Sequence, residues 1–139
     1  MSDVLTANPA PRMLHMLPPA HRAFWTSGEH GRLCLLRSRS TGRWMHPFWD
    51  VSDDDPDLAP EPVSGNGRIF TYTVNEHAYN PRVPPPYIIA IVQLPEQDDL
   101  RIATNIVNCA PDEVAIGMPV RVLFERHGDL YVPVFEPAR

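Results

Sequence analysis

The stretch NEHAYN, residues 75–80, holds the side chains in this sequence that are closest to an acid–base catalytic set. His77 lies beside Glu76 and two residues before Tyr79. A histidine changes its charge near neutral pH, so it can act as a general base when other groups orient it. A histidine on a loop surface has the same sequence context, and that second interpretation is the preferred one.

The two cysteines, Cys34 and Cys109, are the other candidates for catalysis. They lie in the apolar contexts RLCLL and IVNCA, and Cys109 has no candidate base close in sequence. A buried structural thiol is therefore the preferred interpretation of both. The sequence also has no glycine-rich phosphate loop, nucleophile elbow or dinucleotide fingerprint. We expect no catalytic residues and no enzymatic activity of this chain by itself.

Residues 35–47, LLRSRSTGRWMHP, have the outline of a zinc knuckle without its cysteines. Two apolar segments flank a turn of serine, threonine and glycine. Structural zinc needs four strong donors, and hydroxyl groups are neutral at pH 7. The segment is either a metal site that has lost its metal or only a hairpin. The acidic run VSDDDPD, residues 51–57, could recruit a weak cation, but a solvated linker is the preferred interpretation.

The composition limits the class of protein. The chain has 139 residues, the usual size of one domain, with 43% hydrophobic and 21% charged residues. Its net charge of -5 argues against a nucleic-acid binder, which needs a basic surface. A signal-peptide core and an apolar run of membrane-spanning length are both missing from the sequence. We therefore expect a cytoplasmic protein that binds neither nucleic acid nor membrane.

Seventeen prolines divide the chain into short elements, which favours β architecture. Residues 1–17 are predicted to be a flexible arm. A helix is predicted to begin at Pro18 or Pro19, because proline suits a first turn, and to end at Gly28 or Gly31. We divide the chain into this arm, an N-terminal unit over residues 18–58 and a barrel over residues 59–139.

In the N-terminal unit, a strand over residues 32–40 is predicted to pair with a segment over residues 41–49. The acidic and proline-rich residues 50–62 then form a connection. Five strands with a short helical turn between the third and fourth follow, which is the element order of an OB-fold barrel. These elements are strands over 68–74, 86–94 and 100–109, the turn over 110–118, and a hairpin over 119–137 around His127, Gly128 and Asp129.

At this point the sequence resembles a known family. The segments FWTSGEHGRLCLLRSRSTGRWMHP, SGNGRIFTYTVNEHAYNP, PPPYIIAIVQL, NIVNCAPDEVAIGMPVRVLFE and VPVFEP occur in the order found in proteins with a domain of unknown function number thirty-five. Those proteins join an N-terminal helix and a rubredoxin-like zinc ribbon to a C-terminal OB-fold, and they are associated with acyl-CoA. The resemblance implies a mainly β fold: a helix, a degenerate rubredoxin-like hairpin and a five-stranded OB-fold barrel.

The resemblance also locates the missing metal ligands. The first two ribbon cysteines correspond to Ser38 and Thr41, and the second pair would fall near Val51 and Asp54. We therefore expect no metal ligands and no zinc cofactor in this chain. Because zinc can supply much of a small domain's folding energy, packed aromatic residues must replace it. The barrel, the N-terminal helix and another protein are the three candidate neighbours for these aromatics.

The family resemblance implies an accessory subunit of a hetero-oligomer. Its partner would be a thiolase-superfamily enzyme, such as a thiolase, an acyltransferase or an aldolase of steroid side-chain degradation, that acts on an acyl-CoA substrate. A free-standing binder of acyl-CoA or lipid and a partner of an enoyl-CoA hydratase are the alternatives.

The docking surface is expected to combine the helix, the aromatic hairpin and the long loop NEHAYNPRVPPPYI, residues 75–88. The predicted partner- or ligand-binding residues are Phe24, Trp25, Trp44, Phe48, Trp49, His77, Tyr79, Arg82 and Tyr87. The hairpin also contains three arginines, Arg37, Arg39 and Arg43. They could contact CoA phosphates or acidic residues of the partner. Solvated charges are the preferred interpretation.

Overall fold

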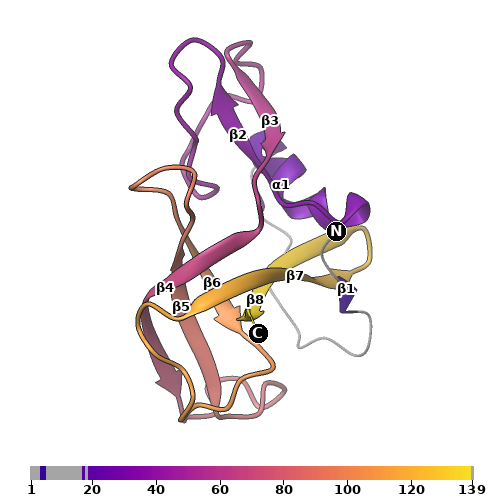
Figure 1. The fold of residues 1–139 in the computed structure, drawn as a ribbon. Helices are drawn as coiled ribbons and strands as arrows, with labels where there is room; N and C mark the ends of the chain where they lie inside the picture. Colours follow the sequence, from indigo (N-terminus) through magenta and orange to yellow (C-terminus); the bar gives the residue numbers. More distant parts are fainter. Residues whose placement is uncertain (1–3, 6–16, 18, 139) are drawn as a thin grey trace.

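The computed structural model describes residues 4–5, 17 and 19–138 and has two parts. A small N-terminal unit of helical turns and two strands stands at one end of a β-barrel (Figure 1). This confirms the predicted fold class, a mainly β chain in which a short helix precedes a five-stranded barrel.

The helical segment lies between the two-stranded sheet and the barrel (Figure 1). Its parts are η1 (Pro19–His21), α1 (Arg22–Thr26) and η2 (Ser27–His30). Gly31 ends it in the left-handed region with a φ of 68°, a conformation that glycine adopts without steric strain. Among the described residues, no helix is long and apolar enough to span a membrane.

The two-stranded sheet differs from the predicted hairpin. Strand β2 (Cys34–Ser38) pairs antiparallel with β3 (Leu58–Pro62) along its full length. The predicted pairing with residues 41–49 is limited to one antiparallel bridge, from Trp44 to Arg37, with backbone hydrogen bonds from Ser38 to Arg43 and from Met45 to Leu36. Pro47 ends this short pairing, because proline has no amide hydrogen to donate. The predicted division at residue 58 stays a prediction.

The barrel has the topology of an OB-fold. Its strands pair in the closed order β7-β4-β5-β6-β8-β7, in which β6 and β8 are parallel. Strands β5 and β6 bury alternate residues, as expected for a sheet with one face on the core, whereas β7 and β8 each bury four consecutive residues. The strands are β4 (Asn66–Asn75), β5 (Tyr87–Gln93), β6 (Arg101–Ile106), β7 (Pro119–His127) and β8 (Leu130–Pro137).

The connections of the barrel match the prediction with one correction. The β7–β8 hairpin turns at Gly128 and Asp129, because His127 pairs with Leu130. The predicted helical turn over residues 110–118 is not a helix; it holds two separate turns, in which the Glu113 amide donates to the Ala110 carbonyl and the Met118 amide donates to the Ala115 carbonyl. A single bond of this kind does not propagate, because helix nucleation costs more free energy than one bond returns.

The predicted arm is described only in part. Residues 4–5 form β1 (Val4–Leu5), which pairs in parallel with Phe124 and Glu125 of β7. Residues 1–3 and 6–16 of the predicted arm lie outside the described residues. The flexibility of the arm therefore stays a prediction.

Gly28 sets the distance between the helical segment and the barrel. A Cβ atom at this position would lie 2.6 Å from Phe124 Cγ and 2.6 Å from Tyr131 Cβ. Phe124 is fully buried, so it has little room to move. The helical segment can approach β7 and β8 this closely only because residue 28 has no side chain.

We predict that Gly28→Ala destabilises the protein by about 1–3 kcal/mol, because overpacking forces the helix and the barrel apart. Chemical denaturation of both proteins measures the difference. Glu29→Ala is the matched control, since Glu29 belongs to the same helical turn and is exposed. Equal losses in the two variants would contradict a role for the close approach at Gly28.

Candidate functional site

The turn that follows β2 is closed by a carboxylate where a zinc ribbon would hold a metal. The Ser38 hydroxyl donates to Asp57 Oδ2 at 2.5 Å, and the Ser40 hydroxyl donates to the same oxygen at 3.0 Å. The Ser40 amide donates to Asp57 Oδ1 at 2.9 Å. These bonds, which we call the Asp57 clasp, join the two ends of the β2–β3 loop, residues 39–57.

The Asp57 clasp stabilises the ionised carboxylate. The pKa of Asp57 is lowered, mainly by the hydrogen bond from Ser38 and further by the bonds from Ser40 and the charge of Arg39. Hydrogen bonds that favour the charged form depress a carboxyl pKa in this way. The clasp is therefore an interaction of the ionised form, and protonation of Asp57 weakens it.

The donors around this turn do not fit a tetrahedral zinc ion. Ser38 and Thr41 present neutral hydroxyls, and the residue that meets Ser38 is Asp57, three positions after Asp54. Within the described part of the chain, no group of three or more histidine, cysteine, aspartate or glutamate side chains is placed to hold a metal ion. The sequence offered no means of selecting Asp57 from the acidic run that contains it.

We predict that Asp57→Asn lowers the urea midpoint of unfolding at pH 7, because the clasp loses its charge. The folded pKa of Asp57 lies below its unfolded value, so its stabilisation is complete above about pH 4 and disappears as the pH falls through the folded pKa. The gap in midpoint between wild type and variant is therefore expected to be largest at pH 7 and to close in acid.

The pKa of Asp99 is also lowered, first by the hydrogen bond from Arg43 and then by that from Gln97, so Asp99 also makes the stability depend on pH. Both proteins contain Asp99, so its contribution cancels when wild type and Asp57→Asn are compared at the same pH. A gap that stays constant between pH 7 and acid would show that the charge of Asp57 does not stabilise the fold.

The predicted aromatic residues divide into a buried and an exposed group. Phe24, Trp25 and Trp44 belong to the hydrophobic core. Phe48 and Trp49 lie on the β2–β3 loop and expose 52% and 45% of their surface. Among these five aromatics, the buried group thus supplies packing inside the chain, and Phe48 and Trp49 offer their area to a partner.

The β2–β3 loop is attached to the barrel. The Trp44 amide donates to Gln97 Oε1 at 2.9 Å, and Gln97 Nε2 donates back to the Trp44 carbonyl at 3.2 Å. Arg43 pairs with Asp99 at 2.7 Å. Figure 1 shows this loop descending beside the turn that joins β5 and β6. For the aromatics, the structure therefore identifies two neighbours within the chain, the helix and the barrel.

The loop over residues 76–86, which we call the proline loop, lies elsewhere. Figure 1 places it at the end of the barrel opposite β2 and β3. His77 and Tyr79 are both exposed, and their rings meet edge to face with centroids 4.5 Å apart. Arg82 is exposed and Tyr87 is half-buried at the start of β5. The structure therefore does not bring the proline loop and the aromatic residues into one surface.

The three hairpin arginines have different environments. Arg37 donates through Nε to the Gly42 carbonyl at 2.8 Å and stacks over Trp44 at 4.8 Å. Arg43 is paired with Asp99, while Arg39 is exposed. Two of the three charges thus hold the N-terminal unit together and are not free for CoA phosphates.

Among the described residues, Cys34 is not paired with a histidine. Burial raises the pKa of the Cys34 thiol, an effect that Arg32 partly opposes, so the thiolate is disfavoured. The Cys34 thiol donates to the Arg32 carbonyl at 3.6 Å. His127 Nε2 lies 2.7 Å from Glu125 Oε1, but these two residues are neighbours on the same face of β7.

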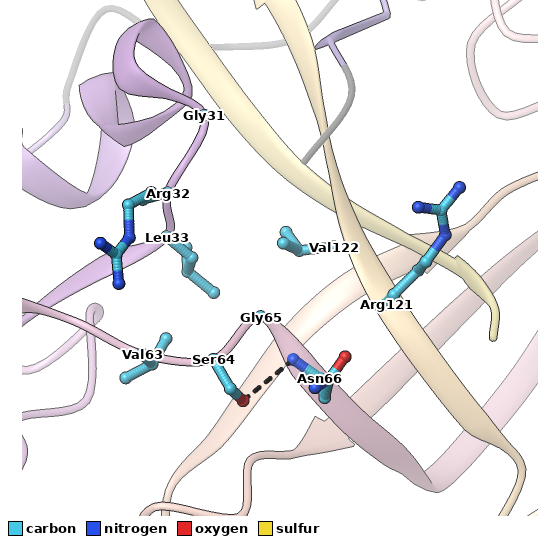
Figure 2. A pocket seen from close by; sticks show the side chains of 9 residues that line it. All are labelled: Gly31, Arg32, Leu33, Val63, Ser64, Gly65, Asn66, Arg121 and Val122. Carbon is cyan, nitrogen blue, oxygen red and sulfur yellow. Dashed lines mark hydrogen bonds between the residues drawn. The ribbon is translucent and has the colours of Figure 1, made fainter. Parts of the chain in front are cut away.

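A hollow of about 400 Å³ lies where the N-terminal unit meets the barrel. Figure 2 shows Leu33, Val63 and Val122 directed toward it, with Arg32 and Arg121 on opposite sides. The Arg121 guanidinium points away from the apolar side chains and is paired with Glu136. Sequence reasoning missed this hollow because its lining comes from three separate segments, residues 31–33, 63–66 and 121–122.

Comparison with known proteins agrees with this architecture. The sequence model described as "ChsH2, C-terminal OB-fold domain" matches residues 60–125. A solved chain of the "Ltp2-ChsH2(DUF35) aldolase" superposes with a TM-score of 0.69 at 30% identity, and covers 93% of this chain and 99% of the other. The chain belongs to the DUF35 family. This confirms the predicted family, domain of unknown function number thirty-five, whereas loss of the zinc ribbon's metal stays a prediction.

The matches to curated relatives cover less than half of each relative. A "Probable enoyl-CoA hydratase alpha subunit" of Thermomonospora curvata is 32% identical over 143 residues, which is 92% of this chain and 41% of the relative. A "DUF35 domain-containing scaffold protein" of Methanocaldococcus jannaschii is 42% identical over 65 residues, which is 46% of this chain and 45% of the relative. This DUF35 chain thus spans less than half the length of these relatives.

Proposed function

We propose that this chain is a non-catalytic accessory subunit that binds an acyl-CoA enzyme of the thiolase superfamily. The observation that carries the proposal is the likeness, over nearly the whole of both chains, to a DUF35 chain of the Ltp2-ChsH2 aldolase. The name of the archaeal relative, a scaffold protein, supports a structural role. The partner supplies the catalytic residues and acts on the acyl-CoA substrate.

The geometry of the described residues supports a role without catalysis. The predicted base, His77, is exposed at a loop and contacts the ring of Tyr79. The Cys34 thiol has a raised pKa, which opposes nucleophilic attack. What the chain offers instead is an ordered loop with two exposed aromatic side chains, which are typical of protein interfaces.

A partner of the hydratase class is the second candidate. It is favoured by the printed name of the Thermomonospora curvata relative, an enoyl-CoA hydratase alpha subunit. In that arrangement the chain would join a hydratase in place of, or together with, a thiolase-like enzyme.

We expect that this chain, co-expressed with a thiolase-like enzyme encoded beside its gene, elutes with it as one complex in size-exclusion chromatography with light scattering. Parallel co-expression with a neighbouring hydratase tests the second candidate. Partner turnover with and without the chain then measures its contribution. Separate peaks with both enzymes, together with measurable binding of acyl-CoA by the isolated monomer, would instead identify a free-standing binder.

We further propose that the chain folds without zinc, because the Asp57 clasp occupies the turn that a metal would hold. Elemental analysis of protein purified without chelator is expected to find far less than one zinc ion per chain. A chelator should leave the thermal midpoint unchanged, whereas zinc-dependent domains unfold when the metal is removed. Stoichiometric zinc, with a lower midpoint after chelation, would overturn the proposal.

A further inference from the structure

The aromatic pair Phe48–Trp49 is exposed although it lies on an ordered part of the fold. Phe48 exposes 52% and Trp49 45% of their surface, whereas Trp25 beneath them is buried. Large aromatic side chains lose much favourable burial when they stay in water, so an exposed pair held in place is a candidate interaction site.

Several contacts hold the pair in one conformation. The Phe48 amide donates to His46 Nδ1 at 3.1 Å, and the Trp49 amide donates to the His46 carbonyl at 3.0 Å. His21 Nε2 lies 2.7 Å from the Trp49 carbonyl oxygen. The rings of Trp25 and Phe48 are 6.1 Å apart, and His46 stacks on Trp49 at 6.0 Å. A partner can therefore bind the pair with little further loss of conformational entropy.

His46 is held in the form that these contacts need. Its Nδ1 accepts the hydrogen bond from Phe48, which requires that nitrogen to carry no proton. Burial is the main cause that lowers the pKa of His46, and the nearby His21 lowers it further, against a contribution from the Arg101 backbone that raises it. The ring is consequently neutral at pH 7, and the surface of the pair stays apolar.

Acidic side chains follow the aromatic pair in the same loop. Four aspartates, which we call the acidic rim, are all exposed: Asp50, Asp53, Asp54 and Asp55. Residues 44–67 contain no arginine or lysine. The loop thus carries an exposed aromatic pair followed by a run of negative charges.

We propose that Phe48 and Trp49 anchor this chain in an apolar pocket of its partner enzyme, and that basic side chains of the partner border that pocket. The inference rests on the proposed function and adds the surface and its chemistry. Charge argues against a second copy of the chain as the occupant. A two-fold symmetric contact would bring two acidic rims together in a protein whose net charge is already -5.

The test uses the complex isolated with the co-eluting partner enzyme. Phe48→Ser with Trp49→Ser is expected to weaken binding at least about tenfold, because buried aromatic anchors dominate interface energies. Phe70→Ser with Ile89→Ser is the matched control. Phe70 and Ile89 are exposed to 47% and 41% on β4 and β5, and their replacement is expected to leave affinity within about twofold.

A second variant tests the acidic rim without touching the aromatic contacts. Asp50→Asn, Asp53→Asn and Asp54→Asn together are expected to slow association and to reduce its dependence on salt, because charged rims steer encounter. Thermal midpoints near that of the wild type would show that each variant is folded. The charge variant remains informative even if loss of Phe48 disturbs the contact with Trp25.

Three other outcomes would contradict the proposed docking surface, and each has a different consequence for the proposed function. Wild-type binding that survives in the Phe48/Trp49 variant, or that is lost more in the Phe70/Ile89 variant, removes the surface but leaves the accessory function. A wild-type homodimer that dissociates in the Phe48/Trp49 variant would identify a second copy as the occupant. Failure of the wild type to bind either enzyme class removes the proposed function together with this partner.

Discussion

One carboxylate closes the longest connection of the N-terminal unit. Ser38 and Asp57 are nineteen residues apart in sequence, yet their side chains share a 2.5 Å hydrogen bond. Closing a loop of this length costs conformational entropy, which the bonds of Ser40 and the pairing of β2 with β3 also offset. An ionised aspartate and two serines thus join the two ends of the loop.

The barrel also holds the β2–β3 loop in place. Gln97 and Asp99, at the turn between β5 and β6, bind the backbone of Trp44 and the side chain of Arg43. At the other side of the unit, Gly28 lets the helical segment rest directly against Phe124 and Tyr131. The N-terminal unit is thus held at two places, and its exposed loop keeps a defined position relative to the barrel.

This arrangement separates residues by role. Burial of Phe24, Trp25 and Trp44 stabilises the junction with the barrel, as large aromatic side chains contribute much apolar area. Phe48 and Trp49 rest on that support without being covered by it. A rigid base beneath exposed aromatics is the arrangement expected of a subunit whose task is to bind another protein.

The sequence by itself determined the five barrel strands, because apolar and turn residues act locally, and its resemblance to known proteins indicated the family. It also limited the helix end to Gly28 or Gly31, and the structure selects Gly31, where a positive φ favours glycine. Tertiary structure alone decided which aromatics are exposed, that β3 is the strand that pairs with β2 along its full length, and that Asp57 meets Ser38. It also separated the proline loop from the aromatic pair. These outcomes depend on contacts between residues far apart in the chain, and no local pattern specifies them.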